Sequence, residues 1–123
     1  MQETTPIENI LDDDRLYRRL APMHMNNDGS VNSGAFKVKR DYDQSISVDL
    51  ARLTTPEATM GAETRPGFRI GALVARIPRA LGFVVRHDPV PEDRAHSLIE
   101  GENNKNKSRE LARAMTVLQN PRT

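Results

Sequence analysis

The chain has 123 residues, with 18 basic and 17 acidic side chains, no cysteine, and a formal net charge of +1. This length suits one domain, and the lack of cysteine excludes disulfides, thiolate metal sites and cysteine nucleophiles. No apolar run reaches the roughly 18 residues of a membrane span, and the N-terminus is polar and acidic, unlike a signal peptide, so we expect a cytoplasmic protein with no membrane contact.

Charge is unevenly distributed along the chain. Residues 1–14 carry five acids and no base. Residues 64–87 carry no acid and five arginines, which are Arg65, Arg69, Arg76, Arg79 and Arg86. Such a chain either closes its acidic end onto its own basic face or offers that face to an anionic partner.

The N-terminal region predicts short helices followed by a loop. Thr5-Pro6-Ile7-Glu8 is a typical helix start, with a capping threonine and a proline at the first helical position. Residues 15–20 fit a second short helical turn or a strand. Residues 23–34 are rich in asparagine, serine and glycine, which are typical of a loop.

The middle of the chain predicts strands. Residues 35–40 and 45–50 alternate apolar and polar side chains, which predicts a β-hairpin. Thr55-Pro56-Glu57 predicts the start of a short helix that Gly61 ends, and residues 68–75 are apolar enough for a central strand.

The C-terminal half predicts two helices and two strands. Pro78 predicts a short helix through Leu81, and residues 83–85 and 95–99 read as strands. Asn103, Asn104 or Asn106 caps a last helix over residues 105–118, whose apolar stripe includes Leu111, Met115 and Leu118.

These elements predict an α+β fold. We expect an acidic segment at 1–14, one domain at 15–119 and a tail at 120–123. The domain is a small mixed or mainly antiparallel sheet of four or five strands, packed against the C-terminal helix and the short N-terminal helices. The predicted core is Phe36, Val38, Ile46, Val48, Phe68, Ile70, Leu73, Phe83, Val85, Leu98, Ile99, Leu111, Met115 and Leu118.

The segment 87–96 is the best candidate for a site. It holds two of the three histidines and three carboxylates, and His96 interrupts an otherwise apolar segment with Asp88 as its expected neighbour. The spacing is not that of a zinc site, so we predict no metal and no cofactor. Ser47 and Asp49 share a strand face and would complete a triad with His96, but Ser47 lies within an ordinary alternating strand rather than a nucleophile turn.

Three functions remain open. The first is a non-enzymatic accessory module that docks on a protein partner through Arg76, Arg79 and Arg86. The second is a small enzyme or ligand-binding protein whose site combines Asp88 and His96 with Arg18 and Ser33. The third is nucleic-acid binding by the Arg65–Arg86 window. Neither a strongly basic pI nor interleaved aromatics supports that third reading.

Several segments together resemble a group of short uncharacterised bacterial proteins. They are Leu16-Tyr17-Arg18-Arg19-Leu20, Ser33-Gly34-Ala35-Phe36-Lys37, the segment 47–57 (SVDLARLTTPE), and the segment 88–101, which contains DPVP and AHSLIEG. The resemblance implies a bacterial single domain in which the segment 88–101 belongs to the common pattern. It implies no activity and no catalytic residue.

Overall fold

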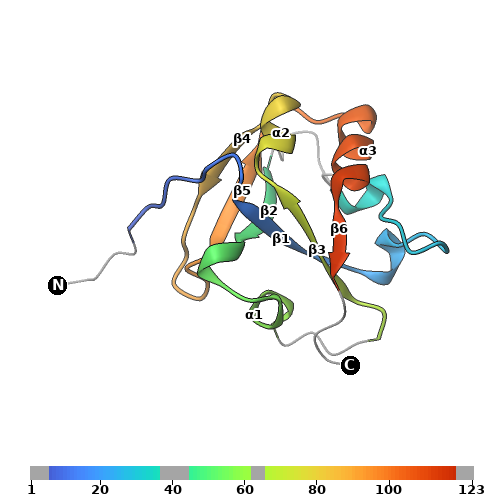
Figure 1. Ribbon diagram of the computed structural model, residues 1–123, viewed down its shortest axis with the longest axis horizontal. Coiled ribbons are helices and arrows are strands. Elements are labelled where there is room, and N and C mark those ends of the chain that lie inside the picture. Colours follow the sequence, from blue (N-terminus) through green and yellow to red (C-terminus); the bar gives the residue numbers. More distant parts are fainter. Residues whose placement is uncertain (1–5, 37–44, 62–65, 119–123) are drawn as a thin grey trace.

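A six-stranded antiparallel sheet organises the protein (Figure 1). The computed structural model describes residues 6–36, 45–61 and 66–118. In chain order the strands are β1 (Arg15–Leu20), β2 (Ser45–Leu50), β3 (Arg69–Val74), β4 (Val84–His87), β5 (His96–Glu100) and β6 (Thr116–Leu118). The helices are α1 (Pro56–Met60), α2 (Arg76–Ala80) and α3 (Lys105–Ala114), with 3-10 turns at Pro22–His24, Ser33–Phe36 and Ala51–Leu53. The strand order is β4-β5-β2-β1-β3-β6, and the fold class is α+β as predicted.

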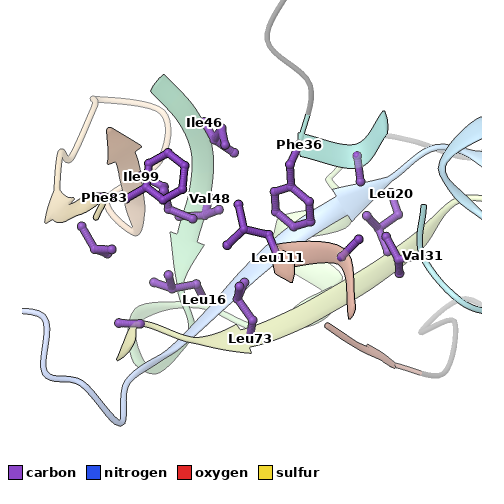
Figure 2. Packing of buried hydrophobic residues seen from close by; sticks show 14 of the residues in the cluster. Leu16, Leu20, Val31, Phe36, Ile46, Val48, Leu73, Phe83, Ile99 and Leu111 are labelled. Carbon is purple, nitrogen blue, oxygen red and sulfur yellow. The ribbon is translucent and has the colours of Figure 1, made fainter. Parts of the chain in front are cut away.

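The main core lies between one face of the sheet and α3. Leu16 and Leu20 of β1 and Leu50 of β2 are fully buried on this face, because alternate residues of a strand point the same way. Figure 2 shows Leu111 of α3 among the apolar side chains of the sheet, close to Phe36. Leu111 and Ala112 of α3 therefore belong to the same buried cluster as the strand residues, whereas Met115 and Leu118 of the predicted stripe lie beyond the helix.

The opposite face is covered only in part. Ile70 and Ala72 of β3 point to this side, and they are buried with Met60 of α1, outside the main cluster. The helix α1 starts at its Thr55 cap and ends at Gly61, whose φ of 62° suits glycine. Both bounds agree with the sequence prediction. Over β2 and β5 the same face carries polar side chains.

The predicted N-terminal helix is wrong. Residues 6–11 have no regular secondary structure, and Ile10 instead inserts into the core at 4% exposure. The Arg52 guanidinium donates a hydrogen bond to the backbone carbonyl of Asn9, and the Arg79 guanidinium donates one to that of Ile10. These tertiary contacts replace the hydrogen bonds that a helix would have supplied. Residues 15–20, which fitted a helical turn or a strand, form β1.

The predicted hairpin is wrong in its first strand. Ala35 and Phe36 belong to the 3-10 turn Ser33–Phe36, and residues 37–40, with Val38, lie outside the described residues. The second strand exists as β2, but it pairs with β1 on one edge and with β5 on the other.

The last two helices differ from their predicted bounds. The helix α2 begins at Arg76, so Pro78 lies inside it. The helix α3 is capped by Asn104 but ends at Ala114, and β6 follows and pairs with β3. Residues 116–118 form a strand rather than a helical turn, because Thr116 and Val117 are β-branched and lie beside the edge of β3. Met115 and Leu118, predicted to belong to the core stripe of this helix, are only half-buried. Phe68 and Leu98, two other predicted core residues, are also only half-buried.

No helix within the described residues is long and apolar enough to cross a membrane.

Candidate functional site

A polar hollow of about 370 Å³ lies on the partly covered face of the sheet. The antiparallel register places Asp49 of β2 between its partners Tyr17 of β1 and His96 of β5. All three side chains therefore project from the same face. The complete lining is Tyr17, Arg18, Arg19, Ser47, Val48, Asp49, Thr59, Asp93 and His96.

His96 is held at both ring nitrogens. Its Nδ1 lies 2.9 Å from the carbonyl oxygen of Asp88 and 3.3 Å from the Asp88 carboxylate. Because both oxygens accept, Nδ1 carries the proton and Nε2 is left as an acceptor. The Ser47 hydroxyl lies 3.3 Å from Nε2 and donates to it. Asp88 is thus the neighbour of His96 that the sequence led us to expect, and it orients the imidazole toward the hollow.

Asp49 and Asp93 form a carboxyl pair on the other side of Ser47. Asp49 is only 8% exposed, and its Oδ2 accepts a hydrogen bond from the Thr59 hydroxyl at 2.7 Å. Burial and a hydrogen bond with the Asp93 carboxyl together raise the pKa of Asp49 to about 7, against the opposing effect of the Thr59 hydroxyl. The neighbouring Asp93 carboxyl opposes ionisation of Asp49, so Asp49 keeps its proton up to about pH 7.

Arg18 reaches the hollow through a gap between two strands. The strands β1 and β2 pair at only two positions, Leu16 with Leu50 and Tyr17 with Asp49. Beyond them the Arg18 guanidinium donates to the Ser47 carbonyl and to the Ala35 carbonyl, each at 2.7 Å. Burial lowers the pKa of Arg18 to about 10.

Ser33 does not belong to this site. It lines a separate hollow of about 370 Å³ beside the C-terminal half of α3, together with Arg109 and Arg113. The site predicted from Asp88, His96, Arg18 and Ser33 therefore assembles without its serine. Ser47, which had been set aside because it lies within a regular strand, contacts His96 instead.

The three arginines expected to dock a partner are paired within the chain. Arg76 contacts Asp13, and Arg79 contacts Asp12 at 2.8 Å. The N-terminal segment passes β4 on its way to β1, and the Glu8 amide donates to His87 of β4 (Figure 1). Of the two alternatives that the charge pattern left open, these contacts favour closure of the acidic end onto the basic face.

Arg86, the third of these arginines, contacts Glu100 at 2.5 Å and Asp88 at 3.3 Å. It therefore holds the carboxylate that orients His96. Arg65 of the proposed nucleic-acid window lies outside the described residues.

Sequence reasoning gave no signal for Thr59 as a lining residue. Thr59 reaches Asp49 only because α1 folds back over β1 and β3. The ten-residue separation between Asp49 and Thr59 along the chain does not indicate that the two side chains are in contact. Asp93 lay within the carboxylate-rich segment 87–96, but nothing in the sequence linked it to Asp49.

Within the described parts of the chain, no group of three or more histidine and carboxylate side chains is arranged to hold a metal ion. No protein-family model, no curated protein and no solved structure matches this chain.

Proposed function

We propose that this protein is a small enzyme that performs general acid–base catalysis on a small polar molecule bound in the sheet-face hollow. The observation that carries the proposal is the position of His96. Its Nδ1 is occupied by Asp88, and its Nε2 faces a hydroxyl 3.3 Å away in a hollow that also holds the Asp49–Asp93 carboxyl pair. An enzyme that transfers protons needs a general base and a general acid that both reach the bound substrate, and this hollow holds one of each.

His96 is the base in this proposal. A substrate hydroxyl or a water molecule that takes the place of the Ser47 hydroxyl would give its proton to Nε2. The imidazolium formed would be stabilised by the Asp88 carboxylate at Nδ1, as in other oriented histidine bases. Arg86 keeps that carboxylate in place at its outer side.

The Asp49–Asp93 pair is the acid. Its proton is available near neutral pH because the pKa of Asp49 is raised to about 7. A positive charge on His96 lowers the pKa of Asp49. Proton uptake by His96 therefore favours proton release by the pair, and the two steps support each other in one turnover.

Ser47 is better suited to positioning than to nucleophilic attack. A serine nucleophile works at a sharp turn with backbone amides gathered around the developing oxyanion. Ser47 instead lies in a paired strand opposite Leu98. Its hydroxyl holds Nε2 in the direction of the hollow until a ligand replaces it.

The experiment is a hydrolysis screen with p-nitrophenyl acetate, a p-nitrophenyl glycoside and bis-p-nitrophenyl phosphate. We expect His96→Ala to lower kcat/KM by about 100-fold or more and Asp93→Asn to lower it by about tenfold or more. Glu92→Gln removes an exposed carboxylate from the same loop and serves as the matched control, with an unchanged rate. A Ser47→Ala loss of less than about tenfold separates positioning from nucleophilic attack. Equal rates for the native protein and His96→Ala on all three substrates would overturn the proposal.

A further inference from the structure

We propose that the ligand of this hollow carries a single negative charge, as a carboxylate, and that Arg18 and Arg19 bind it at the β1 side. The inference deepens the proposed function and rests on the same hollow being the ligand site. It adds the chemical class of the ligand and assigns the cations that recognise it.

Arg18 is a partly buried cation with neutral partners. Its Nε and Nη1 donate to the carbonyls of Ala35 and Ser47, and its guanidinium lies over the Phe36 ring at 5.6 Å. Among the described residues no carboxylate forms an ion pair with it. A buried charge is normally compensated by an opposite charge, because its loss of hydration is large. The loss of hydration of its side chain lowers the pKa of Arg18.

The anchoring of Arg18 leaves one nitrogen for a ligand. The two carbonyl contacts fix the plane of the guanidinium, so the group does not need to be ordered when a ligand arrives. Within the described residues, Nη2 makes no hydrogen bond. Since Arg18 lines the hollow, this donor is the natural partner of an oxyanion placed there.

Arg19 supplies the second cation. Its Nη1 donates to the Met60 carbonyl at 3.2 Å, which ties the side chain to the end of α1. As the next residue along the strand, it points to the face that carries Ser47 and Asp49. Two arginines from adjacent positions of β1 thus border one hollow.

The charge balance of the hollow favours a monoanion. Below about pH 7, where Asp49 keeps its proton, the lining sets two arginines against one ionised carboxylate and so has an excess of about one positive charge. A carboxylate balances that excess. A phosphate monoester carries nearly two negative charges at this pH and would meet repulsion from the carboxyl pair.

The test compares three probes with one ring: benzoate, benzamide and phenyl phosphate. Each is titrated into the full chain, and binding is followed by NMR of the arginine Nε–H groups and the His96 ring. We expect benzoate to shift Arg18 and His96 signals with a Kd in the millimolar range, and both other probes to bind at least about tenfold more weakly. Arg18→Gln should weaken benzoate binding by about tenfold or more. Arg109→Gln, which removes an exposed arginine from the other hollow, should leave it unchanged.

Equal binding of benzoate and benzamide would overturn the inference, as would unchanged benzoate binding by a folded Arg18→Gln variant. If Arg18→Gln does not fold, the Arg19→Gln variant provides the test. The loss of Arg19 is less disruptive to the fold, because the Arg19 guanidinium donates to only one carbonyl, that of Met60. That variant should weaken benzoate binding at least about threefold, and an unchanged Kd would refute the inference.

Benzoate binding that persists in His96→Ala supports the anion subsite even if no hydrolysis is found. Conversely, His96-dependent hydrolysis without selective benzoate binding refutes only the anion subsite. The results therefore distinguish a failure of the proposed acid–base catalysis from a failure of the proposed anion binding.

Discussion

Replacing Asp49 by asparagine should make the protein more stable at alkaline pH. In the folded protein the pKa of Asp49 is raised to about 7 from an ordinary value of 3.8. The folded state accommodates the neutral carboxyl of Asp49. The contribution of this group to the unfolding free energy is therefore fully present below about pH 4, where the carboxyl is protonated in both states. As pH rises from about 4 to about 7, the unfolded chain ionises Asp49 while the folded protein keeps it protonated, so stability falls over this range and levels off above pH 7.

The size of the effect follows from that raised pKa. A difference between 3.8 and about 7 corresponds to about 4 kcal/mol of lost unfolding free energy at high pH. We expect about 2 kcal/mol in practice, because the hollow admits water. Asparagine keeps the acceptor for Thr59 and offers an N–H group to Asp93, so the substitution removes the charge with little change in contacts.

Urea unfolding at pH 4.5 and pH 8 measures this effect. At pH 8 the Asp49→Asn variant should unfold at a midpoint more than about 1 M higher than the native protein, and at pH 4.5 the two midpoints should nearly coincide. Glu92→Gln, at an exposed position, should follow the native protein at both pH values. An Asp49→Asn variant that is less stable than the native protein at pH 8, or an unchanged pH dependence, would refute the reasoning.

Two further predictions concern the packing around the site. Arg79→Ala should lower the unfolding free energy, measured in urea, by about 1–2 kcal/mol, because the Arg79 guanidinium joins the N-terminal segment to α2 and β4. Arg113→Ala, which removes an exposed ion pair with Glu110, should change it by less than about 0.5 kcal/mol. Equal effects of the two would contradict the role given to the N-terminal segment. Gly71→Ala should lower stability by about 1–3 kcal/mol, because a Cβ at that position would lie 2.5 Å from the Met115 sulfur. In the double variant with Met115→Ala most of the Gly71→Ala loss should disappear, and a fully additive result would show that the contact is not responsible.

Much of the local structure could be predicted from the sequence. Apolar runs and alternation located β2, β3 and β5, and cap chemistry located the start of α1 at Thr55 and of α3 at Asn104. These predictions succeed because side-chain periodicity and capping hydrogen bonds are local properties of a few neighbouring residues. The predictions at the two ends of the domain failed where contacts from distant residues outweighed local preference. Arginine side chains hold residues 9–10 in an extended path, and β3 draws Thr116–Leu118 out of a helix.

The candidate site was predicted in part. The sequence grouped Arg18 with His96 and Asp88, and it placed Ser47 and Asp49 on one strand face. It could not show that Asp49, Asp93 and Thr59 line the same hollow, because that depends on the strand order β5-β2-β1 and on the fold of α1 over the sheet.

The sequence by itself determined an α+β domain with an aliphatic core, and it marked His96 and Asp88 as the pair to examine. Only the tertiary structure decided that Asp49, Asp93 and Tyr17 line one hollow with His96 and Arg18, and that Ser33 lies in another. The physical reason is that antiparallel register aligns residues far apart in the chain on one face of a sheet. Burial on that face then changes their proton affinity, raising the pKa of Asp49 and lowering that of Arg18.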